Sequence, residues 1–137
     1  MKPFEYYLHS ELVKKSRKDI ERARSLINDA RGRMNDLKLI EMEKLPKMFF
    51  EYAYDALRDF CDAVLLLDGY KSFSHEASIV YLSKKGFDVA ILGKLDRFRY
   101  KRNGSKYYGV PITITDAKDI KKFYLEIKEK LNKILTI

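Results

Sequence analysis

Residues 51–70, EYAYDALRDFCDAVLLLDGY, together with the few residues before them, decide the fold of this chain. Apolar side chains recur here every three or four residues, which is the spacing of a helix. A main stripe and a second stripe beside it consist of Phe49, Ala53, Ala56, Phe60, Val64 and Leu67, and of Phe50, Leu57, Cys61 and Leu65. Pro46 suits the first turn of this helix, and Gly69 suits its end. A helix with so wide an apolar surface is predicted to be the central helix of a bundle.

Helical spacing continues on both sides of this segment. The other expected helices cover residues 12–34, 74–86, 88 to about 106, and 116–134. Gly32 is expected to fray or bend the end of the first of these, Ser74 is an N-cap, and Thr115 or Asp116 caps the last. No strand is expected, and the run PITIT at 111–115 is interpreted as a loop. The prediction is an all-α, up-and-down helical bundle of about five helices, in a single domain over residues 1–137.

The charge balance of the chain predicts an acidic partner. Among 137 residues, 46% are hydrophobic and 35% are charged, which allows an apolar core under a charged exterior. Lys and Arg number 28 against 20 Asp and Glu, so the net charge is +8. Such a charge attracts a polyanion or an acidic protein over a long range. The alternative is that the charge serves solubility alone.

Cysteine content and hydropathy bear on the compartment. The single cysteine, Cys61, excludes a disulfide framework within one chain and is typical of a reducing cytosol. The first residues, MKPFEYYLHSELVKK, contain no apolar signal core. No window approaches the roughly twenty apolar residues of a membrane span. We therefore expect a cytoplasmic protein without a membrane partner.

The segment RFRYKRNGSKYYG, residues 97–109, carries the strongest functional signal. Its basic side chains are Arg97, Arg99, Lys101, Arg102 and Lys106, and its aromatic ones are Phe98, Tyr100, Tyr107 and Tyr108. Arginine offers a planar fork of donors to phosphate, and aromatic rings offer faces on which bases stack. The segment is therefore expected to contact RNA or a nucleotide.

Other polar side chains leave alternatives open. Asp55, Asp59 and Asp62 form one stripe on the central helix, and the arginines either pair with them or bind phosphate. The two roles are compatible, because a carboxylate can orient an arginine whose other donors face a phosphate. His75 is interpreted as a packing or hydrogen-bonding side chain, with a general base as the alternative. No metal is expected, because Mg²⁺ draws ligands from more than one element, and the lack of a nucleotide-cofactor motif leads us to expect no cofactor.

Three segments together resemble the HEPN family, small helical domains named for higher eukaryotes and prokaryotes nucleotide-binding. They are the central helix, SHEASIVYLSKKG at 74–86, and LDRFRYKRNGSKYYG at 95–109, and the resemblance covers about residues 46–135. It implies a bundle that commonly forms a homodimer, in which two arginine-bearing helices meet around a shared cleft. Many members are metal-independent endoribonucleases, often toxins encoded beside a minimal nucleotidyltransferase antitoxin.

The resemblance also implies site residues. The family's active motif is an Arg followed about four to six residues later by a His. Arg102 matches the Arg, Asn103 matches the polar residue that often follows it, and Tyr107 lies where the His is expected. The resemblance thus assigns catalysis to Arg102, Asn103 and Tyr107. The chemistry of the basic and aromatic side chains, independently of the resemblance, assigns RNA or nucleotide binding to Arg97, Arg99, Lys101, Lys106 and Tyr108.

The missing His leaves catalysis open. A tyrosine with a pKa near 10 is a poor base at neutral pH, whereas RNA binding tolerates the replacement. The expected function is that of a HEPN-type toxin or accessory component of a toxin–antitoxin or defence pair, contacting RNA or a nucleotide. The alternative is a non-catalytic module that binds a nucleotide or docks an acidic partner.

Overall fold

The computed structural model describes residues 1–136, and within them the chain forms six α-helices and one small sheet. The α-helices are α1 (Phe4–His9), α2 (Ile20–Asp36), α3 (Pro46–Leu67), α4 (His75–Tyr81), α5 (Val89–Tyr108) and α6 (Ile114–Ile134). Two short 3₁₀ helices are η1 (Leu37–Leu39) and η2 (Leu82–Lys85), and the strands are β1 (Val13–Lys15) and β2 (Tyr70–Ser72). The all-α helical bundle is therefore confirmed.

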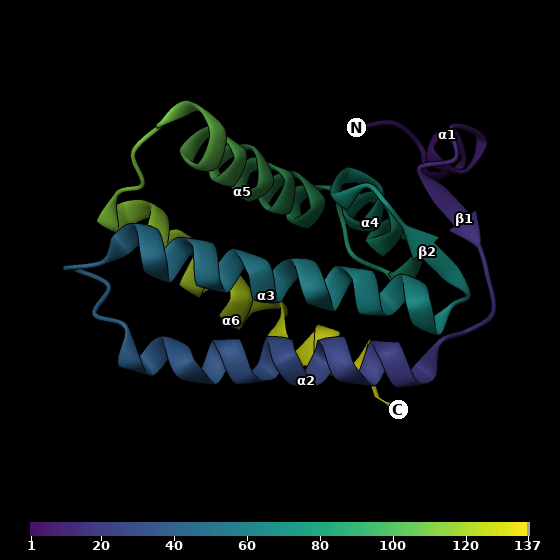
Figure 1. Ribbon diagram of the computed structural model, residues 1–137, viewed down its shortest axis with the longest axis horizontal. Coiled ribbons are helices and arrows are strands. Elements are labelled where there is room, and N and C mark those ends of the chain that lie inside the picture. The colour runs from purple at the N-terminus through teal and green to yellow at the C-terminus, as the bar shows by residue number, and fades with distance from the viewer. Residues whose placement is uncertain (137) are drawn as a thin grey trace.

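Helix α3 is the central helix, as predicted. It contacts α2, α4, α5 and α6, and in Figure 1 it runs through the middle of the molecule, antiparallel to α2. Its first helical residue is Pro46, and Gly69 follows its end with a φ of 85°. Helices α4 and α5 lie along one side of α3, whereas α2 covers the other and α6 passes behind them (Figure 1). Helices α3, α4 and α5 therefore contact one another on this side of the bundle.

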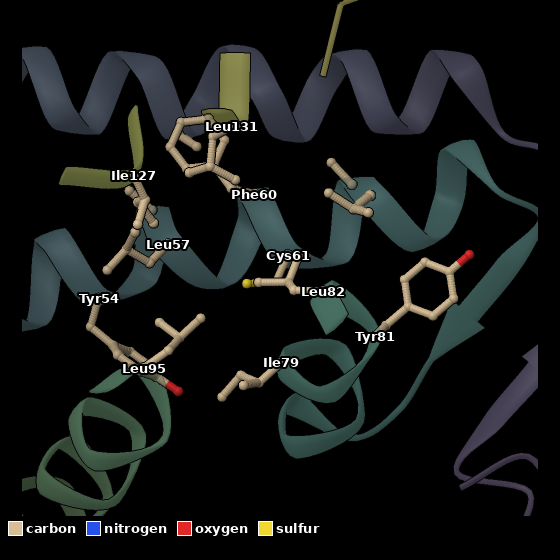
Figure 2. Close-up of a cluster of buried hydrophobic side chains, with 14 of the residues drawn as sticks. Tyr54, Leu57, Phe60, Cys61, Ile79, Tyr81, Leu82, Leu95, Ile127 and Leu131 are labelled. Atoms are coloured by element: carbon tan, nitrogen blue, oxygen red, sulfur yellow. The ribbon is translucent and has the colours of Figure 1, made fainter. Parts of the chain in front are cut away.

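The core joins residues far apart in sequence. Figure 2 shows Leu57 and Phe60 of α3 close to Ile127 and Leu131 of α6, and all four side chains are buried. On the opposite side, Tyr54, Cys61, Ile79 and Leu95 bring α3, α4 and α5 together (Figure 2). This packing fixes α4 and α5 against the central helix. None of the helices in residues 1–136 combines the length and the apolar character needed to cross a membrane.

The helix predicted to begin at Leu12 begins instead at Ile20, with Asp19 as its N-cap. The Asp19 carboxylate accepts a hydrogen bond from the backbone N–H of Arg22 at 3.0 Å. The residues before it form α1 and β1, and β1 pairs antiparallel with β2. The expectation of no strand is therefore wrong, because the backbone of residues 13–15 finds its hydrogen-bond partners across this ribbon rather than within a helix.

Three other predicted boundaries shift. Helix α2 continues through Gly32 to Asp36, and α5 continues through Gly104 to Tyr108. Helix α6 is capped by Thr113 and not by Thr115 or Asp116. The Thr113 hydroxyl accepts from the Asp116 N–H at 3.1 Å, and the Asp116 carboxylate accepts from the Thr113 N–H at 2.8 Å. This capping box leaves only residues 111–113 of the PITIT run in the loop.

Candidate functional site

Helix α5 carries the basic segment on a firmly anchored helix. The Asp88 carboxylate caps its start by accepting from the Ile91 N–H at 2.9 Å, and Leu92 and Leu95 are buried. Arg99 and Arg102 lie one and two turns beyond Leu95 on the same face. Their side chains are only 20% and 14% exposed. The fold therefore holds both guanidinium groups against α3 and α4 instead of projecting them into solvent.

A surface cavity of about 310 Å³ lies where α3, α4 and α5 meet. We call it the arginine cavity, and it is lined by Tyr54 and Arg58 from α3, by Ser74, His75 and Glu76 at the start of α4, and by Arg99, Arg102, Asn103 and Tyr107 from α5. Three arginines and one carboxylate face it. This balance of charge favours an anionic ligand.

Arg102 is oriented by two residues of α3. Its Nη2 donates to the Asp55 carboxylate over 3.4 Å, and its guanidinium carbon lies 5.6 Å from the centre of the Tyr54 ring. The Nε atom is buried and has no hydrogen-bond partner in residues 1–136. A carboxylate and an aromatic face thus hold this guanidinium in place while one of its donors is left unsatisfied.

Arg99 is held more tightly than Arg102. Its Nε donates to Asp96 at 2.7 Å, and its Nη2 donates to Glu76 at 3.0 Å. Glu76 also accepts a hydrogen bond from the buried Tyr7 hydroxyl at 2.8 Å. This chain of contacts ties α1, α4 and α5 together on one side of the arginine cavity and partly offsets the charge of Arg99.

His75 contributes a neutral imidazole to the arginine cavity. Burial, together with the positive charges of Arg58, Arg99 and Arg102, lowers the pKa of His75 to about 3. Its Nδ1 is hydrogen-bonded to the Tyr54 hydroxyl, and its Nε2 is buried without a partner in residues 1–136.

The direction of the hydrogen bond between Tyr54 and His75 sets the tautomer of the imidazole. Burial raises the pKa of Tyr54, so the phenol keeps its proton at neutral pH and is able to donate it to Nδ1. In that arrangement the imidazole proton resides on Nε2, which becomes a second unsatisfied donor among the residues that line the cavity.

The aspartate stripe of α3 does not act as one unit. Asp55 contacts Arg102, whereas Asp59 pairs with Arg33 of α2 and Asp62 accepts a hydrogen bond from the Ser78 hydroxyl at 2.7 Å. Burial raises the pKa of both Asp59 and Asp62. One aspartate thus meets an arginine of α5, and the other two join α3 to its neighbours. In residues 1–136, no group of three or more His, Cys, Asp or Glu side chains forms a metal-binding cluster.

The structure separates the predicted site residues into two groups. Arg99, Arg102, Asn103 and Tyr107 line the arginine cavity, and Lys106 and Tyr108 are exposed near it at the end of α5. The Lys106 ammonium lies 5.5 Å from the Tyr107 ring centre. Arg97 and Lys101 lie elsewhere. Arg97 lines a separate cavity between α5 and α6, and Lys101 pairs with Asp116 at 3.3 Å, because helical rotation turns both away from the face of Arg102.

Five lining residues were not among the predicted site residues: Tyr54, Arg58, Ser74, His75 and Glu76. They come from α3 and from the start of α4, and only the packing of these helices brings them to α5. The sequence offered one signal for two of these residues, because Ser74 is the N-cap of α4 and so places His75 and Glu76 in the first turn of that helix.

Comparison with protein-family models, with curated proteins and with solved structures finds no match to this chain. The HEPN resemblance therefore rests on the residues themselves.

Proposed function

We propose that this chain is a HEPN-type protein that binds RNA or a nucleotide through a phosphate group held in the arginine cavity. One observation carries the proposal. Arg102 and His75 both line the cavity, and the Nε of Arg102 and the Nε2 of His75 are buried without a partner in residues 1–136. An unsatisfied buried donor costs about 1–3 kcal/mol. With the Tyr54 hydroxyl donating to Nδ1 of His75, phosphate oxygens would satisfy both donors at once.

The electrostatics of the arginine cavity suit the same ligand. Arg58 is exposed, lines the cavity and forms no ion pair in residues 1–136, so its guanidinium donors are not held by a carboxylate. Arg102 keeps free donors beside its contact with Asp55. Guanidinium donors bind phosphate through charge-assisted hydrogen bonds, which are about twice as strong as neutral ones. The neutral His75 adds a donor without adding like charge.

Exposed aromatic rings extend the site beyond one phosphate. Tyr107 and Tyr108 are 64% and 83% exposed at the end of α5. Bases stack on such rings with about 1–3 kcal/mol per base. A strand of RNA reaches both the cavity and these rings, whereas a mononucleotide fills only the cavity. A single-stranded RNA is therefore expected to bind more tightly than a mononucleotide.

Fluorescence anisotropy with a labelled single-stranded oligoribonucleotide tests the proposal, with a mononucleotide as competitor. Arg102→Ala is expected to weaken binding by tenfold or more, since a hydrogen bond to a charged group contributes about 1.5–3 kcal/mol. Arg97→Ala removes the same charge from the same helix outside the cavity and is expected to have a much smaller effect. Equal losses in the two variants would reduce binding to general charge attraction and overturn the proposal.

Metal-independent RNA cleavage is a second candidate function, and the position of His75 is the observation that favours it. Tyr107 replaces the family's His in sequence, but an imidazole from α4 lines the same cavity as Arg102. The lowered pKa of His75 opposes a role as base until a bound phosphate offsets the arginine charges. Binding therefore ranks before cleavage.

Incubation of an RNA pool in EDTA tests this candidate. Cleavage by the wild type that is lost in both Arg102→Ala and His75→Asn would support it. Absence of cleavage by a folded wild type that binds RNA would leave binding as the function.

The proposal includes the cytoplasmic homodimer and the minimal nucleotidyltransferase partner that the HEPN resemblance implies, with the chain as toxin or accessory component. Exposed apolar surface at the end of α5 supports the dimer, because Tyr100 and Val110 are 76% and 40% exposed. A second α5 packed there would cover them. Sedimentation equilibrium of the wild type and of Tyr100→Glu tests this part, and a wild type that stays monomeric would contradict it.

A further inference from the structure

A second hollow, of about 500 Å³, lies among α2, η1, α3 and α6. We call it the α2–α6 groove. Its lining includes the apolar side chains of Met34, Leu37, Phe49, Ala53 and Leu125. It shares no residue with the arginine cavity, which α3 forms with α4 and α5 instead. The groove is therefore a separate feature of the fold, unexplained by phosphate binding.

The rim of the α2–α6 groove is basic. Arg31, Lys38, Lys121 and Lys128 line it, and its lining contains no Asp or Glu. Arg31 and Lys38 contact only the amide oxygens of Asn132 and Asn35, at 3.3 Å and 3.2 Å. Within residues 1–136 none of the four cations forms an ion pair. Four unpaired cations around an apolar floor are complementary to an acidic, amphipathic ligand.

Apolar side chains beside the groove indicate the size of that ligand. Leu39 follows Lys38 of the rim and is 84% exposed, and Met48 precedes Phe49 of the floor and is 53% exposed. Leu125, in the lining itself, is 60% exposed. A small molecule confined to the groove would leave Leu39 and Met48 in water. A protein segment contacts Leu125 in the groove and can extend beyond it toward these two side chains.

We propose that the α2–α6 groove receives an acidic amphipathic helix of a partner protein. An amphipathic helix places its apolar residues at positions three and four apart into such a groove, and acidic residues on its flanks would meet the lysines and the arginine of the rim. A second copy of this chain is the poorer occupant, because its net charge of +8 would be brought against a basic rim. The groove and the arginine cavity would then bind the partner and the phosphate at the same time.

A synthetic helical peptide of about five turns, with leucines on one face and glutamates on the others, is the probe. A scrambled peptide of the same composition is its control, because it has the same charge but no apolar face. Binding to the full chain is measured by isothermal titration calorimetry at low and at physiological salt. The wild type is expected to bind the amphipathic peptide at least tenfold more tightly than the scrambled one.

Two variants and a matched control locate the binding. Leu125→Glu places a charge in the groove lining, and the exposure of Leu125 makes the substitution compatible with folding. K121E/K128E reverses two rim charges. K122E/K133E makes the same change on the same helix outside the groove. Both groove variants are expected to lose about tenfold or more in affinity, and the control less than about threefold.

Four outcomes would overturn the proposal. Equal binding of the amphipathic and scrambled peptides would mean that charge alone attracts them. Equal losses of affinity in the groove variants and the control variant would mean that the groove is not the binding site. No binding of the amphipathic peptide to a folded wild type would mean that the groove binds no such helix. A wild-type dimer that Leu125→Glu dissociates would make a second copy the occupant.

Discussion

Removing the hydroxyl of Tyr54 tests how much its hydrogen bond to His75 stabilises the fold. Tyr54→Phe keeps the ring that faces the Arg102 guanidinium and deletes only the hydrogen bond to Nδ1 of His75. The imidazole would then have two buried nitrogens without partners, since its Nε2 already has none in residues 1–136. A buried polar atom deprived of its partner costs about 1–3 kcal/mol. We expect the free energy of unfolding to fall by about 2 kcal/mol, roughly thirtyfold in the folding equilibrium.

Urea denaturation followed by circular dichroism measures this loss, and the slope against denaturant should not change. Tyr52→Phe is the matched control on the same helix, because the Tyr52 hydroxyl contacts Asp36 at 3.2 Å at an exposed site. The control is expected to lose less than about 0.5 kcal/mol. Equal stability of the two variants would mean that the Tyr54–His75 hydrogen bond does not contribute to the free energy of unfolding.

Further perturbations test other parts of the structure. Because the pKa of His75 is lowered to about 3 in the folded protein, only the unfolded chain takes up this proton between about pH 6.5 and pH 3. The free energy of unfolding should therefore fall as the pH is lowered through this window, by up to about 1.4 kcal/mol per pH unit more than in His75→Asn. Parallel plots of stability against pH for the two proteins would contradict the lowered pKa of His75. Thr113→Ala should cost about 1 kcal/mol by removing the cap of α6, whereas Thr115→Ala should cost less than half of that in the same urea assay. Gly86→Ala should destabilise by about 1 kcal/mol, because Gly86 has a φ of 84°. Gly32→Ala should stabilise the protein by about 0.5–1 kcal/mol, because Gly32 lies inside α2 with open space around it. Thermal melts measure both glycine variants, and a change of melting temperature in the same direction for Gly86→Ala and Gly32→Ala would contradict these backbone assignments.

The central helix and its caps could be predicted from sequence because their signals are local. Pro46, Gly69 and Ser74 act within one turn of themselves, and the structure places each at the predicted helix end. The apolar spacing before Ile20 was misleading. Leu12 continues the stripe of α2, but the Leu12 carbonyl accepts from the Phe73 N–H at 2.8 Å across the β-ribbon. Such a contact between residues distant in sequence leaves no periodic signal.

Only part of the candidate site could be predicted. Arg99 and Arg102 extend the buried face of α5, and this could be predicted because they follow Leu95 at helical spacing. Tyr54 and His75 come from two other helices, and their hydrogen bond depends on how α4 packs against α3. The lowered pKa of His75 likewise arises from burial and from arginines of α3 and α5. No local pattern around His75 encodes these neighbours.

In the proposed function, a phosphate binds to the Nε of Arg102 and the Nε2 of His75 in the arginine cavity. Nitrogen-15 NMR of the side-chain N–H groups follows these two atoms while a single-stranded oligoribonucleotide is added. Both signals are expected to shift together and to saturate at the affinity measured by anisotropy, while the Nε signal of Arg97 stays nearly constant. Saturated RNA binding with both signals unmoved would overturn the proposed phosphate site.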